Sequence, residues 1–73
     1  MQTNGHTPTE IVAKMIAVRR GIGMTQEQLA HKMGVTQETI SHWETGRKSP
    51  RAVSLERWAA ALGLEWGLYQ RVI

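Results

Sequence analysis

Apolar residues recur along the chain at steps of three and four, the spacing that places side chains on one side of an α-helix. The pattern predicts helices over about 7–20, 26–33, 36–45, 52–62 and 64–73, and a glycine follows each of the first four. No stretch alternates between apolar and polar residues as a β-strand would. We therefore predict an all-α fold, a compact five-helix bundle, with a flexible N-terminal tail over 1–6 and a single domain over 7–73.

Threonines stand where the first three helices are expected to begin. Thr7 and Thr25 are each followed three residues later by Glu or Gln, which is the pattern of a capping box. Thr36 can cap the third helix without that reciprocal bond, because Thr39 occupies the returning position. The second and third helices are so short that each is marginal by itself, so they must stabilise each other by packing.

The second and third helices are joined by a very short turn, and the apolar positions of this unit are Leu29, Met33, Val35, Ile40 and Trp43. Ala30 is small enough for the helices to cross closely, and Gly34 can adopt the positive φ that the turn requires. This is the pattern of a helix-turn-helix. Helical spacing also favours Trp43 and Trp58 as core residues rather than exposed stacking platforms.

The stretch MTQEQLAHKMGVTQETISHWETGRKSP, followed by ALG at 61–63, resembles the Cro/repressor-type helix-turn-helix family, also called XRE-like or lambda-repressor-like. The resemblance covers most of the chain, from Ile11 to Tyr69. It implies a five-helix bundle that binds operator DNA as a regulator and has no enzymatic activity. The helix over 36–45 would be the recognition helix in the major groove.

The resemblance also implies roles for individual residues. Gln26 resembles a glutamine that binds a DNA phosphate and buttresses the glutamine opening the recognition helix, here Gln37. The segment after Gly46 resembles one that lies along the DNA backbone. Arg19 and Glu44 match a pair that forms a partly buried salt bridge between the first and third helices.

The polar residues of the third helix support the same interpretation. At roughly 100° per residue, five of them fall on one arc of about 140°, with Ile40 and Trp43 on the opposite side: Gln37, Glu38, Ser41, His42 and Thr45. We expect the base-reading residues to be Gln37, Glu38, Ser41 and His42. A glutamine can bond adenine N6 and N7 together, and a glutamate can accept from cytosine N4.

Charge adds a phosphate-binding surface to this picture. The formal net charge is +3, and no acidic residue falls between Thr45 and Leu55. We expect DNA phosphates to be bound by Gln26, Thr36, Thr45, Arg47, Lys48 and Arg51. Four other basic residues are expected to be plain surface charges: Lys14, Arg20, Lys32 and Arg57.

Several kinds of chemistry find no support in the sequence. The chain has no cysteine, and its three histidines lack the spacing of metal ligands, so neither a disulfide nor a metal nor another cofactor is expected. No nucleophile–base–acid set and no small-molecule site is evident. No apolar run approaches the ~20 residues of a membrane span, and the first ten residues lack the features of a signal peptide. We expect a cytoplasmic protein in a bacterium or a phage-infected host.

One such unit contacts only a few base pairs, so we expect a homodimer on a palindromic operator, formed in solution or only on DNA. The apolar residues near the C-terminus could either close the core or form the dimer surface: Trp66, Tyr69, Val72 and Ile73. The regulatory role stays open among three kinds of protein. These are a phage Cro or small repressor, an antitoxin that binds a toxin and its own operator, and a restriction–modification controller.

Overall fold

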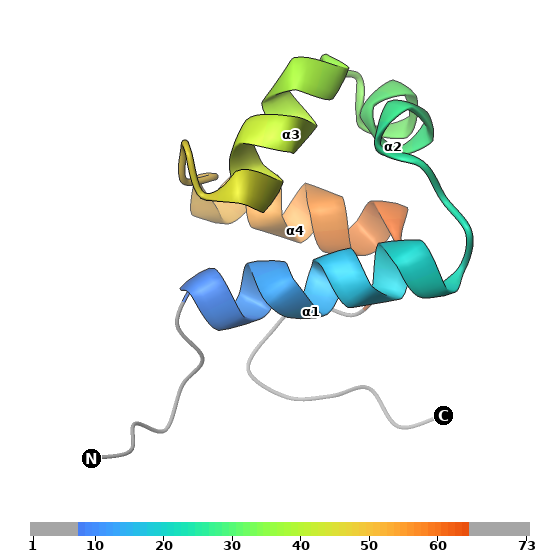
Figure 1. Ribbon diagram of the computed structural model, residues 1–73, viewed down its shortest axis with the longest axis horizontal. Helices are drawn as coiled ribbons and strands as arrows, with labels where there is room; N and C mark the ends of the chain where they lie inside the picture. The colour runs from blue at the N-terminus through green and yellow to red at the C-terminus, as the bar shows by residue number, and fades with distance from the viewer. Residues whose placement is uncertain (1–7, 65–73) are drawn as a thin grey trace.

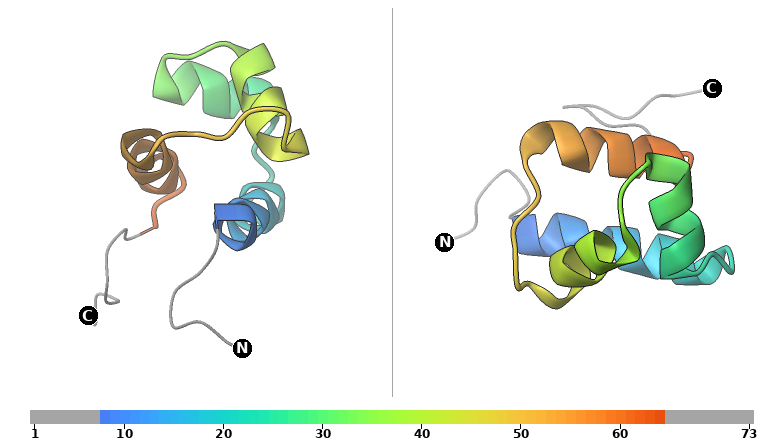
Figure 2. Two further views of the ribbon diagram at one scale, coloured as in Figure 1. Left: turned by 90° about the vertical axis from the view of Figure 1, so that its left-hand side faces the viewer. Right: turned by 90° about the horizontal axis from the view of Figure 1, so that it is seen from above.

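The computed structural model describes residues 8–64, which contain four α-helices and no strand. The helices α1 and α4 lie in one layer, and α2 and α3 lie across it (Figures 1 and 2). Their bounds are Pro8–Gly21 for α1, Gln26–Met33 for α2, Gln37–Thr45 for α3 and Ala52–Ala61 for α4. The all-α prediction is confirmed for this range. The expected tail, the Thr7 cap and residues 65–73 of the expected fifth helix lie outside the described residues.

The ends of α2 and α3 are set by the local signals in the sequence. The Thr25 hydroxyl accepts a hydrogen bond from the Gln28 backbone N–H at 3.0 Å, and the Gln28 side chain accepts one from the Thr25 N–H at 2.9 Å. The Thr36 hydroxyl likewise accepts from the Thr39 N–H at 3.1 Å. Gly34 ends α2 with φ +73°, a conformation that side chains with a Cβ rarely adopt. The predicted starts and the predicted turn are therefore confirmed.

The core is built from all four helices, and its buried apolar residues are Met15, Leu29, Ala30, Met33, Ile40, Leu55, Trp58, Ala59 and Leu62. Trp58 is fully buried, and its ring stacks on that of Trp43 with centroids 5.5 Å apart. Trp43 is half-buried and packs against the core, so the expectation that both tryptophans are core residues is confirmed. The Trp58 indole Nε1 has no hydrogen-bond partner among the described residues.

Arg57 of α4 has a role that the sequence did not reveal. Its Nη2 donates a hydrogen bond of 2.6 Å to the backbone carbonyl of Met33, the last residue of α2. Carbonyl groups in the last turn of a helix lack partners within the helix, and a positive charge there is favourable. The expectation that Arg57 is a plain surface charge is therefore wrong, because it ties α4 to the end of α2.

Candidate nucleic-acid interface

A buried ion pair joins α1 to α3. Arg19 Nε donates to Glu44 Oε2 at 2.7 Å, and Arg19 Nη2 donates to Glu44 Oε1 at 2.9 Å. The two side chains are only 7% and 4% exposed. Arg19 Nη1 also donates to the Met24 carbonyl at 2.7 Å, so the guanidinium is held from both sides. The salt bridge implied by the family resemblance is present, and it places the C-terminal part of α3 relative to α1.

Glu44 extends this pair to the two glutamines that open α2 and α3. The Gln26 side-chain amide Nε2 donates to Glu44 Oε1 at 3.0 Å. Gln37 Nε2 in turn donates to Gln26 Oε1 at 3.4 Å. The structure therefore contains a continuous chain of side chains from Arg19 through Glu44 and Gln26 to Gln37. The sequence pointed to the contact between the two glutamines but not to the bond between Gln26 and Glu44.

This chain of bonds determines how Gln37 is oriented. A carboxylate only accepts hydrogen bonds, so Gln26 must turn its NH₂ group toward Glu44 and its oxygen toward Gln37. Gln37 then uses one of its two N–H groups on Gln26 and keeps its Oε1 and its second N–H. The Gln37 side chain is exposed, so one acceptor and one donor are presented to solvent at the start of α3.

The other expected base-reading residues differ in exposure. Glu38 is exposed, whereas Ser41 and His42 are half-buried. Glu38 and His42 are one turn apart, with His42 Nε2 3.9 Å from Glu38 Oε2. The arc of polar residues expected on α3 therefore exists, and two of its members form a pair.

The two threonines expected to bind phosphate are placed differently. Thr36 Oγ1 lies 2.9 Å from Thr39 Oγ1 at the start of α3, where it also caps the helix. The Thr45 hydroxyl donates back to the Ser41 carbonyl at 2.8 Å. Phosphate oxygens only accept, so Thr45 would have to release this bond before it could donate to DNA.

The basic segment 46–51 starts directly at the end of α3. The backbone N–H groups of Arg47 and Lys48 donate to the His42 carbonyl at 2.9 and 3.1 Å, so the segment leaves α3 in a defined direction. The side chains of Arg47, Lys48 and Arg51 are all exposed. Arg51 precedes α4 and provides no side-chain cap. The first N–H groups of α4 thus remain available for an external acceptor.

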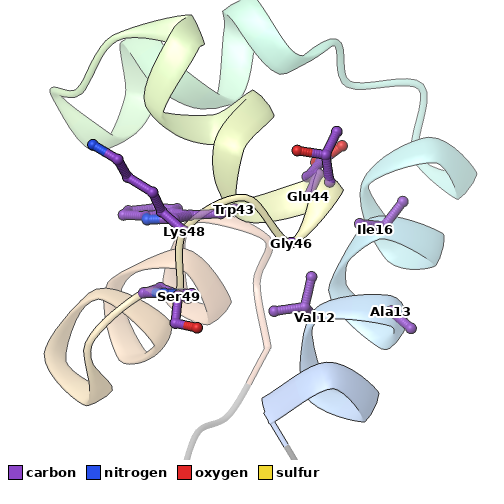
Figure 3. Close-up of a pocket in the computed structure, with 10 residues that line it drawn as sticks. Val12, Ala13, Ile16, Trp43, Glu44, Gly46, Lys48 and Ser49 are labelled. Atoms are coloured by element: carbon purple, nitrogen blue, oxygen red, sulfur yellow. The ribbon is translucent and has the colours of Figure 1, made fainter.

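An open groove of about 280 Å³ lies beneath the basic segment, between α1 and the end of α3 (Figure 3). Its walls include Val12, Ile16, Trp43 and Pro50, and the Glu44 carboxylate in it is already paired with Arg19.

Among residues 8–64 no cluster of three or more His, Cys, Asp or Glu could hold a metal. No helix in the same part of the chain is long and apolar enough to cross a membrane.

The sequence matches known proteins over this same unit. The profile of the helix-turn-helix family HTH_3 matches residues 15–68. The chain is 49% identical over 47 residues to an uncharacterised HTH-type transcriptional regulator of Methanothermobacter thermautotrophicus, covering 64% of this chain and 68% of that one. It is 36% identical over 52 residues to antitoxin HigA1 of Mycobacterium tuberculosis, covering 71% of this chain. The matched region spans only 35% of HigA1.

The fold is also similar to solved structures of HipB. A HipB–O1–O2 complex gives a TM-score of 0.78 at 29% identity, covering 94% of this chain and 100% of that one. A HipA–HipB–O2–O3 complex gives the same score and identity and covers 97% of the matched chain. The family match includes the α2–α3 unit and most of the core. The chain therefore belongs to the HTH_3 helix-turn-helix family of the Cro/C1 type, and is a DNA-binding transcriptional regulator rather than an enzyme.

Proposed function

We propose that the protein binds a specific double-stranded operator by inserting α3 into the major groove, as a homodimer on a palindromic site. The observation that carries this proposal is the series of hydrogen bonds that runs from Arg19 through Glu44 and Gln26 to Gln37. These bonds orient the polar Gln37 side chain at the start of an exposed helix face, and the other end of the series is the buried ion pair between Arg19 and Glu44. A side chain that served solubility alone would not need this support.

The orientation of Gln37 favours adenine as its target. Adenine presents N7 as an acceptor and N6–H₂ as a donor in the major groove. The free Oε1 and the remaining N–H of Gln37 are the complementary pair. Gln26 keeps a second N–H, which is available to a phosphate oxygen next to the start of α2.

We expect Gln37→Ala to weaken binding to the operator by about 1–3 kcal/mol and to relax the preference at one base pair. Titrations with the operator and with each single-base variant of it measure both effects. Circular dichroism serves as the folding control, since Gln37 is exposed and contributes little to the core. An equal loss of affinity on operator and on random DNA would contradict direct base readout.

We expect Arg47→Ala combined with Lys48→Ala to weaken binding to all sequences alike. It should reduce the slope of log K against log salt by about one to two units, because each phosphate neutralised contributes close to one. The matched control is Lys14→Ala with Arg20→Ala, which removes the same two kinds of charge from exposed positions of α1. A slope changed equally by both double variants would show that segment 46–51 has no particular role.

The dimer and the operator are tested together by selecting bound sequences from a random DNA pool. Two units reading half-sites one helical turn apart, roughly 34 Å, would give an enriched palindrome. Enrichment of a single short half-site would favour a monomer. Absence of any enrichment would count against sequence-specific binding. The residues proposed for the dimer surface all lie outside the described range: Trp66, Tyr69, Val72 and Ile73.

A second candidate role is that of an antitoxin, and the relatives favour it over a phage Cro protein or a restriction–modification controller. The chain is similar to antitoxin HigA1 and to HipB, which is solved together with HipA. We propose that it too binds a protein partner in addition to DNA. Co-expression with the product of the neighbouring reading frame, followed by size-exclusion chromatography, tests this. A stable complex and relief of that product's toxicity would support the role, and separate elution would contradict it.

A further inference from the structure

The helix α2 is held at both ends by arginines of neighbouring helices. Arg19 of α1 donates from Nη1 to the carbonyl of Met24, just before α2, at 2.7 Å. Arg57 of α4 donates from Nη2 to the carbonyl of Met33, the last residue of α2, at 2.6 Å. Because α2 runs from the end of α1 toward α4 (Figure 2), the two bonds hold opposite ends of the helix. Arg19 also forms the buried ion pair with Glu44, whereas the bond from Arg57 stands outside that pair.

The end of α2 near α4 is fixed only partly by apolar packing. Leu29 and Met33 are buried in the core, but hydrophobic contact has no preferred direction. Beside them an open groove of about 320 Å³ separates α2 from α4, where α4 presents the small side chains of Ala60 and Ala61. Arg57 lines this groove and reaches across it to the helix end. A short hydrogen bond from a charged donor is directional and strong, so it fixes the direction in which the chain leaves α2.

The direction of the chain at the end of α2 determines where Gln37 lies. Met33 precedes Gln37 by only four residues, through the turn between α2 and α3. The bond from Gln37 Nε2 to Gln26 Oε1 is 3.4 Å long, already beyond the usual range for N–H···O bonds, so a small displacement of the turn would break it. Glu44 holds Gln26 from the other side. The two partners of this contact are thus held separately, Gln26 through Glu44 and Gln37 through the turn that Arg57 fixes.

We infer that Arg57 is a positioning residue for operator recognition, which acts on Gln37 through the Met33 carbonyl and not by contact with DNA. The inference rests on the proposed reading of a base pair by Gln37. Without the bond from Arg57, Gln37 loses its fixed orientation and with it the advantage of the correct base. The basic segment 46–51 starts at the other end of α3 and keeps its phosphate contacts. The loss therefore falls on specific binding and spares binding to random DNA.

The experiment compares the affinities for the selected operator and for a random duplex by fluorescence anisotropy. The ratio of the two affinities should fall about three- to tenfold in Arg57→Met, with the preference relaxed at the same base pair as in Gln37→Ala. The matched control is Lys32→Met, which removes a positive charge from an exposed residue of the same groove and should keep the ratio within about twofold. Unfolding of part of the sample lowers both affinities equally, so the ratio separates positioning from stability.

A double-mutant cycle shows whether Arg57 acts through Gln37. If it does, Arg57→Met combined with Gln37→Ala should have the ratio of Gln37→Ala alone within about twofold. Independent roles would multiply the two losses. Arg57→Lys keeps the charge and a donor for the Met33 carbonyl, so it should retain more of the operator preference than Arg57→Met.

The outcomes separate this inference from the proposed function. An unchanged ratio in Arg57→Met, losses that multiply in the double variant, or equal losses in Arg57→Lys and Arg57→Met would each overturn the inference and leave base reading by Gln37 intact. If Gln37→Ala itself left the base preference unchanged, the proposed readout would fail, and the inference with it.

Discussion

Replacing Glu44 by alanine is expected to lower the free energy of unfolding by about 3–5 kcal/mol, because the buried Arg19 guanidinium loses its partner. The whole stability of a chain of 73 residues is expected to be only about 4–11 kcal/mol. The variant should therefore unfold at a much lower urea concentration, or be unfolded without urea. Circular dichroism during urea titration measures the shift directly.

Glu38→Ala provides the matched control, because it removes the same group from an exposed position of the same helix. Its effect on stability should stay within about 0.5 kcal/mol. If Glu44→Ala were as mild as Glu38→Ala, the ion pair would not stabilise the fold. Combining Arg19→Met with Glu44→Met should recover much of the loss, since replacing both members of a buried pair by apolar residues is often neutral. That double variant should nevertheless lose operator preference, because Gln26 no longer has its acceptor.

Replacing Trp58 by alanine should have an effect of similar size. The side chain is fully buried at the centre of the core and stacks on Trp43. Removing it leaves a large cavity, for which the expected cost is about 3–5 kcal/mol. In a domain of this size that corresponds to a fall in melting temperature of roughly 12–40 °C. Thermal unfolding followed by circular dichroism measures it.

Trp58→Phe separates the loss of volume from the loss of the polar atom. The indole N–H is buried without a partner among the described residues, so removing it also removes a desolvation cost of about 1–3 kcal/mol. Phenylalanine keeps one ring against Trp43 and should therefore be much milder than alanine. If the two substitutions were equally damaging, the indole nitrogen would have to make a bond that stabilises the fold.

The features predicted from the residues alone are the local ones, whereas the long-range Arg19–Glu44 salt bridge was expected only from the family resemblance. Caps at Thr25 and Thr36, the glycine turn and the apolar spacing depend on neighbours within about four residues, so they can be read from the chain directly. The repeated Thr-Gln-Glu places Gln26 and Gln37 at the same position of their helices. Their contact across the turn was implied by the family resemblance and not by this equivalence.

The features that sequence reasoning missed depend on long side chains that reach across the fold. Arg57 is exposed on α4, and nothing in its neighbours distinguishes a solvated arginine from one that binds a distant carbonyl. The bond from Gln26 to Glu44 likewise joins residues 18 positions apart. The bond from Thr45 to the Ser41 carbonyl was missed for another reason, because a hydroxyl can bond either its own helix or a ligand.

The bonds of Arg19 and Arg57 have a consequence for how the protein folds. Each joins residues about 25 positions apart, one from α1 to α3 and the other from α4 to α2. Closing such loops costs entropy that is recovered only when both partners are in place. The α2–α3 unit thus cannot reach its final geometry before α1 and α4 have docked against it. A peptide containing α2 and α3 alone should not bind the operator, and in the whole chain operator binding and helical structure should disappear in a single cooperative transition.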